Sequence, residues 1–151
     1  MNPTTIVVRP AIERDATSVS ALLHELGYWL EAAQVEKNIA LLSLSSSDAV
    51  LVAEVDSGVV DVVGVLSFHI IPLFHVVGNL GRITSLVVSP GWRQHGVGRK
   101  LAEAAQEFAW SQGCLRIEVT SGDRRAEALE FYQKLGYQID ERRFIKHLTP
   151  G

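Results

Sequence analysis

The stretch from Leu80 to Thr120 limits the folds open to this 151-residue chain more than any other part of it. An apolar run, Leu80 to Ser89, stops at Pro90-Gly91, a helical period follows, and a second strand-like run covers Leu115 to Thr120. A strand, a helix and another strand in this order favour parallel pairing of the two strands with a right-handed crossover. We therefore expect an α/β fold built around this unit.

Strand and helix patterns also alternate on both sides of this unit, in the order β-α-α-β-β-β-α-β-α-β-β for the whole chain. A length of 151 residues suits one hydrophobic core, so we expect residues 1–151 to form a single domain. Besides the central unit, the expected elements are strands at Ile6 to Arg9, Ala49 to Val55, Val60 to Ile71, Tyr137 to Ile139 and Phe144 to Leu148, and helices at Glu13 to Leu26, Val35 to Leu44 and Arg124 to Leu135.

Charge and cysteine content exclude several classes of function. The net charge is -3, from 14 Lys and Arg against 17 Asp and Glu, so no basic face for nucleic acid is expected. Cys114 is alone, and no Cys/His cluster has the spacing of a zinc site, so we expect neither an internal disulfide nor a metal. The sequence has no signal peptide and no apolar run of membrane-spanning length, which predicts a cytoplasmic protein with no membrane partner.

The loop between the first strand and the helix of the central unit reads Arg93-Gln94-His95-Gly96-Val97-Gly98-Arg99. Backbone amides at a helix N-terminus can hold phosphate oxygens, and glycines let the phosphates approach closely, although two glycines also suit a plain tight turn. A dinucleotide fingerprint would need glycine where Leu101 stands, and a phosphate-binding Walker loop would need Gly-Lys-Ser/Thr after position 97. The loop therefore matches neither of these two phosphate-binding motifs.

This loop resembles the signature Arg/Gln-x-x-Gly-x-Gly/Ala of the GNAT superfamily of N-acetyltransferases, which opens a helix after a strand. A second family pattern is matched where Phe131-Tyr132 precedes Leu135-Gly136-Tyr137, and the resemblance extends over nearly the whole chain. It implies a mixed, mostly antiparallel central sheet with helices on both faces. It also implies that a splayed pair of parallel strands forms an acetyl-CoA cleft.

The resemblance further implies roles for individual residues. The pantetheine arm of acetyl-CoA would pair with the backbone of Leu86, Val87 and Val88, and an N-H near Val88 would polarise the thioester carbonyl. Tyr132 resembles the family's proton donor for the departing thiolate, although a purely packing role is its alternative. The pyrophosphate would lie on the loop, which makes Arg93, Gln94, His95, Gly96, Val97, Gly98 and Arg99 the remaining cofactor-binding residues.

The sequence departs from the family pattern at two places. Thr84 and Ser85 stand where many members carry a carboxylate that serves as the general base, so a water chain or a residue from elsewhere would take the proton. The candidate residues for such a general base are His69, His75 and Glu31. Where an Asn is frequent in the family, this chain has Arg125 next to Arg124, which would serve as surface charges or touch a CoA phosphate.

The function expected from the resemblance is direct transfer of acetyl from acetyl-CoA to an amine, without a covalent acyl-enzyme. The acceptor, a small molecule or a protein amine, would meet the loops from Gly27 to Val35 and from Phe74 to Asn79. Two alternatives stay open: a CoA-binding interaction module without catalysis, and a transferase that uses another acyl-CoA. We also expect a homodimer, because self-association is common in the family and the terminal strands offer edges.

Overall fold

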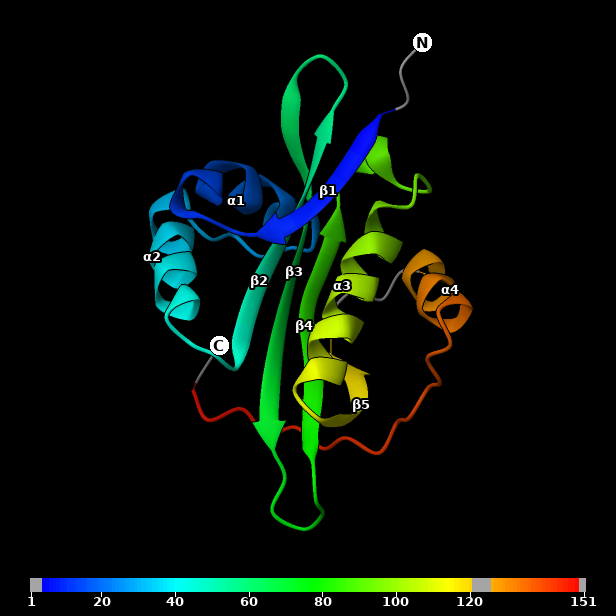
Figure 1. The fold of residues 1–151 in the computed structure, drawn as a ribbon. Helices are drawn as coiled ribbons and strands as arrows, with labels where there is room; N and C mark the ends of the chain where they lie inside the picture. The colour runs from blue at the N-terminus through cyan, green and yellow to red at the C-terminus, as the bar shows by residue number, and fades with distance from the viewer. Residues whose placement is uncertain (1–3, 121–125, 150–151) are drawn as a thin grey trace.

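The computed structural model describes residues 4–120 and 126–149, and its main element is a five-stranded sheet with the order β1-β2-β3-β4-β5 (Figure 1). Neighbouring strands are antiparallel except for β4 and β5, which run parallel. The mixed, mostly antiparallel α/β sheet is thereby confirmed, as is the parallel pair. The strands are β1 (Thr5–Pro10), β2 (Asp48–Asp56), β3 (Val60–Pro72), β4 (Asn79–Val88) and β5 (Cys114–Val119).

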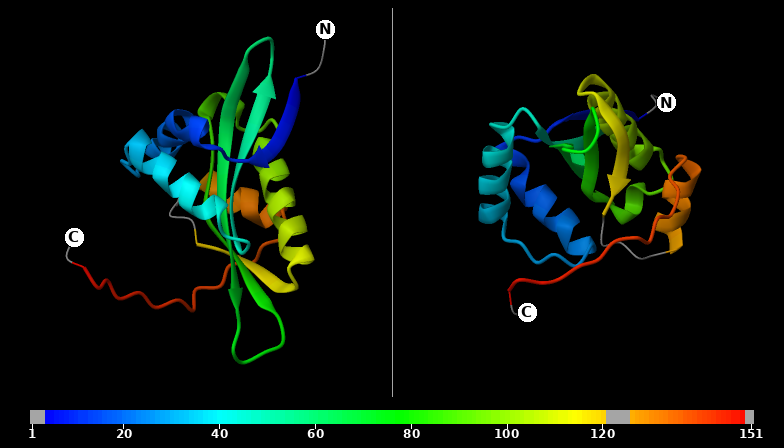
Figure 2. Two further views of the ribbon diagram at one scale, coloured as in Figure 1. Left: turned by 60° about the vertical axis from the view of Figure 1, so that its left-hand side comes forward. Right: turned by 90° about the horizontal axis from the view of Figure 1, so that it is seen from below.

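Helices cover both faces of this sheet, as the two views in Figure 2 show. A 3-10 turn (Glu13–Asp15), α1 (Ala16–Glu25) and α2 (Ala32–Ser43) lie on one face. On the other face lies α3 (Val97–Ser111), which follows a second 3-10 turn (Pro90–Trp92). The last helix, α4 (Ala126–Lys134), comes after β5. None of the helices in the described part of the chain is long and apolar enough to cross a membrane.

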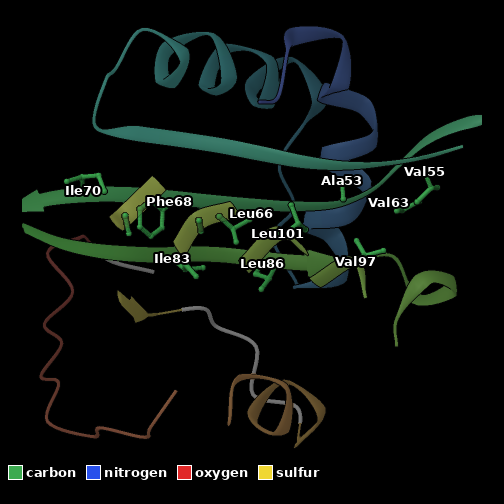
Figure 3. Packing of buried hydrophobic residues seen from close by; sticks show 12 residues of the cluster. Ala53, Val55, Val63, Leu66, Phe68, Ile70, Ile83, Leu86, Val97 and Leu101 are labelled. Atoms are coloured by element: carbon green, nitrogen blue, oxygen red, sulfur yellow. The ribbon is translucent and has the colours of Figure 1, made fainter. Parts of the chain in front are cut away.

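The core forms two layers because side chains alternate across β3. Leu66 and Phe68 belong to the cluster under α3, whereas Val65 belongs to the cluster under α1 and α2. Figure 3 shows the first cluster, in which Leu66 and Phe68 lie beside Ile83 of β4. Burial of each such side chain contributes about 1.5–3 kcal/mol, so β3 is the best-anchored strand of the sheet. It therefore provides a rigid neighbour for β4.

The two C-terminal strands that the sequence predicts are absent from the structure. Residues 137–139 and 144–148 lie in an extended segment that pairs with no strand of the described residues. Its middle is charged, and Arg142 there bonds back to Asp140 at 2.8 Å instead of supporting a ladder. The prediction was wrong because an apolar, β-branched run becomes a strand only when a partner edge accepts its backbone groups. The start of the last predicted helix, with Arg124 and Arg125, lies outside the described residues.

A close backbone contact holds β4 against the core. Gly81 of β4 lies under the ring of Phe68, and a Cβ at this position would lie 2.5 Å from Cζ of that ring. Real Cβ atoms do not approach other atoms so closely, and Phe68 is fully buried, so its ring has little room to move. Glycine is therefore required for this packing.

We predict that Gly81→Ala lowers the free energy of unfolding by about 1–3 kcal/mol, the usual cost of overpacking a core. Urea denaturation measures this change. Gly91→Ala is the matched control, because a Cβ there meets no atom within 4 Å and the backbone needs no positive φ. Equal stability of the two variants would show that the sheet yields around Phe68.

Candidate active site

The parallel pair of β4 and β5 separates halfway along β4. The ladder joins Asn79–Ile83 to Cys114–Val119, and its last contact is the bond from the Thr120 N-H to the Ile83 carbonyl, at 2.9 Å. Beyond Ile83, β4 continues to Val88 and is paired only with β3. On its other edge, residues 84–88 thus meet no strand of the described chain. This gives an open, extended backbone edge next to a cleft.

A pocket with a volume of about 570 Å³ lies where the two strands diverge. The end of β4, the loop that leads into α3, the first turn of α3 and helix α4 form its walls. The predicted site residues that line it are Leu86, Val87, Val88, Arg93, Gln94, Gly96, Gly98, Arg99 and Tyr132.

Two predicted cofactor-binding residues turn their side chains elsewhere. Val97 is 1% exposed and packs in the core under α3, so only its backbone remains for a ligand. His95 is exposed, and its Nδ1 lies 2.7 Å from the carbonyl oxygen of Arg93. The side chains at these two positions therefore do not form the pocket wall.

The loop into α3 has an unusual backbone. Gln94 has a φ of 63° and Gly96, the N-cap of α3, has a φ of 84°. A non-glycine residue with positive φ is uncommon and carries strain, so the surrounding structure must hold Gln94 in place. The first amides of the 15-residue α3 follow directly, and such amides have no intrahelical acceptor and lie at the positive end of the helix dipole. The loop is therefore suited to an anion.

Arg93 supplies a fixed positive charge beside this loop. Its Nε donates a hydrogen bond of 3.2 Å to the carbonyl of Val88, which ties the guanidinium to the end of β4. Its Nη2 is buried and finds no hydrogen-bond partner in the described part of the chain; the nearest acidic oxygen, Oε2 of Glu25, is 4.0 Å away. An unsatisfied buried donor is costly, so this arrangement favours an acceptor supplied by a ligand.

Helix α4 closes the pocket because Gly98 has no side chain. A Cβ at Gly98 would lie 3.0 Å from Cζ of Phe131, so glycine allows α4 to pack against the start of α3. The ring of Tyr132 lies edge-on to Phe131 at 5.2 Å and to Tyr137 at 5.8 Å. Tyr132 is half-buried and lines the pocket. Tyr137 lies outside the pocket wall, and burial raises the pKa of its phenol. Aromatic packing thus holds the ring of Tyr132 at the pocket wall.

A chain of polar side chains crosses the sheet next to this pocket. His69 Nδ1 lies 2.7 Å from Oδ1 of Asp48, and its Nε2 lies 2.9 Å from Oγ1 of Thr84. Ser67 continues the chain, with its Oγ 2.7 Å from Thr84 Oγ1 and 2.5 Å from Ser85 Oγ. The β3–β4 register shifts here, from Ser67 opposite Ser85 to Phe68 opposite Ile83, which leaves Thr84 as the extra residue of a bulge.

Of the candidate bases, the structure brings only His69 into a network. His75 is exposed in the loop between β3 and β4, and Glu31 is exposed just before α2. Sequence reasoning missed Asp48 and Ser67, because their contacts depend on the strand register and no local motif marks them. Within residues 4–120 and 126–149, no three His, Cys, Asp or Glu side chains are placed to hold a metal ion.

Residues 16–137 match the model of the acetyltransferase (GNAT) family. An aminoalkylphosphonate N-acetyltransferase of Salmonella typhimurium is 34% identical over 88 residues, which cover 58% of this chain and 57% of that protein. A glucosamine 6-phosphate N-acetyltransferase of Trypanosoma brucei brucei is 35% identical over 82 residues, 54% of each chain. The chain thus matches little more than half the length of these curated relatives.

Solved structures resemble the chain over a larger part of its length. A crystal structure of a Trypanosoma brucei acetyltransferase has a TM-score of 0.77 and 28% identity, and the match covers 95% of this chain and 100% of the other. A glucosamine-6-phosphate N-acetyltransferase from Arabidopsis thaliana has a TM-score of 0.79 at 22% identity, covering 96% and 99%. The second likeness is one of fold alone.

Proposed function

Because this chain belongs to the GNAT family of acetyltransferases, we propose that it is a single-domain N-acetyltransferase that transfers acetyl from acetyl-CoA directly to an amine. One observation carries the proposal: the open edge of β4, the anion-binding loop before α3 and the phenol of Tyr132 all meet in one pocket. Acetyl-CoA has an extended amide-bearing arm, a pyrophosphate and a thioester, and each of these parts finds a matching feature there.

The fit of acetyl-CoA can be followed along the pocket. The amides of the pantetheine arm would pair with the backbone of Leu86, Val87 and Val88, which no strand of the described chain covers on that edge. The pyrophosphate would lie on the loop from Arg93 to Arg99, whose two arginines both line the pocket. The thioester would then lie near the level at which β4 and β5 part.

The chemistry that this placement supports is direct aminolysis of the thioester. An unprotonated amine attacks the carbonyl carbon, a backbone N-H near Val88 stabilises the oxyanion, and the carbon-sulfur bond breaks. Tyr132 donates its phenolic proton to the leaving thiolate. A phenol held close to sulfur in a half-buried pocket can do this although its ordinary pKa exceeds that of a thiol.

The proposed acceptor is a small primary amine. The names of both curated relatives describe amines that also carry a phosphonate or a phosphate, so 2-aminoethylphosphonate and glucosamine 6-phosphate lead the acceptor panel. A peptide with an N-terminal alanine tests protein amines. Release of free thiol from acetyl-CoA measures turnover, and propionyl-CoA in parallel tests the acyl preference. Tight acetyl-CoA binding without turnover on any amine would favour a CoA-binding interaction module instead.

We also propose a homodimer that works in the cytoplasm. β5 ends the sheet in the described residues, and the extended C-terminal segment exposes Ile139, Phe144, Ile145 and Leu148. An open strand edge and an exposed apolar segment suit pairing with the same features of a second copy. Light scattering should then give twice the chain mass of 16.6 kDa, and a monomer at micromolar concentration would refute the dimer.

The cytoplasmic location is supported by the unpaired Cys114 thiol, which fits a reducing compartment.

We predict that Gly96→Asp weakens acetyl-CoA binding at least tenfold, because it puts a carboxylate beside the pyrophosphate. Isothermal calorimetry measures the affinity. Gly58→Asp in the turn between β2 and β3 is the matched control, since both glycines have positive φ and a Cβ at either meets no atom within 4 Å. If both folded variants bind as the wild type does, the phosphates lie elsewhere.

We predict that Tyr132→Phe slows the chemical step by about 10² to 10⁴-fold, the usual contribution of general acid catalysis. Acetyl-CoA affinity should change little, because the ring and its packing remain. Single-turnover rates across pH measure the effect and separate it from product release. Tyr137→Phe, a neighbouring tyrosine outside the pocket wall, is the control and should keep the wild-type rate. Wild-type rates in Tyr132→Phe would make this ring a packing residue.

A further inference from the structure

The polar chain across β2, β3 and β4 has no role in the steps of acetyl transfer described above. It contains a carboxylate, an imidazole and three hydroxyls in unbroken hydrogen-bond contact, from Asp48 through His69, Thr84 and Ser67 to Ser85. We propose that His69 is the general base of the transfer and receives the acceptor's proton through these hydroxyls. The inference rests on the proposed acetyltransferase activity.

The direction of each hydrogen bond in the chain follows from its carboxylate end. The hydroxyl of Ser45, and next to it His69, lower the pKa of Asp48, so this carboxylate is ionised at neutral pH and can only accept. Nδ1 of His69 must then carry the hydrogen, which leaves Nε2 as the acceptor for Thr84. Ser67 can in turn donate to Thr84, and Ser85 can donate to Ser67.

All three hydroxyls can thus donate toward His69, and the oxygen of Ser85 is left to accept a proton from outside the chain. Ser85 lies on β4 between Ile83, where the ladder with β5 ends, and Leu86, which lines the pocket. The proposal therefore places the attacking amine beside this end of the relay. Ser85 and Thr84 are half-buried and remain accessible. The relay therefore connects the place where an amine would attack with a base that is set back in the sheet.

The bulge at Thr84 makes this connection possible. In a regular ladder, consecutive residues of β4 would point to opposite faces of the sheet. Because Thr84 is the extra residue between the pairs Ser67–Ser85 and Phe68–Ile83, its hydroxyl and that of Ser85 both reach Ser67. A regular strand would break the relay at this point.

Charged side chains lie on both strands that flank His69. Asp48 on β2 faces it directly and stabilises the imidazolium that forms, whereas Arg82 lies opposite His69 on β4 and opposes it. Arg82 is itself paired with Glu118 of β5 at 3.1 Å, and Glu118 also binds Arg116 at 2.9 Å. Arg82 thus has a carboxylate partner of its own, and Asp48 is the acidic group in direct contact with His69.

The proton balance of the reaction can be stated completely. An ammonium acceptor gives one proton through the hydroxyls to Nε2 of His69, which later returns it to water. The nitrogen lone pair forms the C-N bond, and the electrons of the breaking C-S bond remain on sulfur. Tyr132 protonates that sulfur, and the second nitrogen proton of the adduct restores the phenol. The products are the acetamide, CoA thiol and one proton in solution.

The test compares His69→Gln with His147→Gln, the same substitution at an exposed histidine of the C-terminal segment. The values of kcat/KM for 2-aminoethylphosphonate and glucosamine 6-phosphate are measured between about pH 6 and about pH 9.5. The rates of the wild type and of His147→Gln should level off once the base is deprotonated. His69→Gln should lose about 10² to 10⁴-fold at neutral pH and keep rising as the amine itself deprotonates, at unchanged acetyl-CoA affinity.

Thr84→Val keeps the shape of the side chain and removes only its hydroxyl, so it tests the relay if His69→Gln does not fold. It should show the same continued rise with pH. A wild-type pH profile in a folded His69→Gln or Thr84→Val variant would overturn the relay and leave the proposed function intact. No thiol release by the wild-type protein with any amine of the panel would overturn both.

Discussion

The parting of β4 from β5 after Ile83 is the constraint on which the site depends. Up to that residue, the parallel ladder closes the edge of β4, and the bond from Thr120 to Ile83 is its last contact. Beyond it, β4 stays paired with β3 on its other edge as far as Val88. A strand that is supported on one edge and open on the other can accept an extended ligand without refolding. The pocket, the loop and α4 are arranged around that open edge.

The core makes this arrangement stable. β3 is buried on both faces, with Leu66 and Phe68 under α3 and Val65 under α1 and α2. β4 is therefore fixed by packing as well as by hydrogen bonds, and Gly81 lets its backbone approach the ring of Phe68. At the pocket itself, Gly98 plays a similar part for Phe131, so this glycine sets the distance between α3 and α4. The strain at Gln94 is retained because the loop is fixed at both ends.

The proposed acid and the proposed base come from different elements. Tyr132 is carried by α4 and held among aromatic rings, whereas His69 lies in the sheet and contacts the carboxylate of Asp48. This separation lets each group have its own surroundings, since the ring of Tyr132 packs against aromatic rings and the imidazole contacts a carboxylate. The proposed base on β3 would take the place of the carboxylate that the family pattern leads one to expect at Thr84 or Ser85. The bulge at Thr84 provides the link between them.

The sequence by itself determined the elements and the family, because hydrophobic periods and glycine positions are local properties. The strands, the helices and the loop from Arg93 to Gly98 could be read in this way, and two motifs indicated the cofactor site and Tyr132. The tertiary structure alone decided whether the residues from Tyr137 to Leu148 find a partner edge, and in the described chain they find none. It also decided which histidine meets a carboxylate. Asp48 and His69 are 21 positions apart, and their contact depends on the register of β2 against β3. The contacts of Thr84 depend on the bulge in β4. No local sequence pattern specifies either feature.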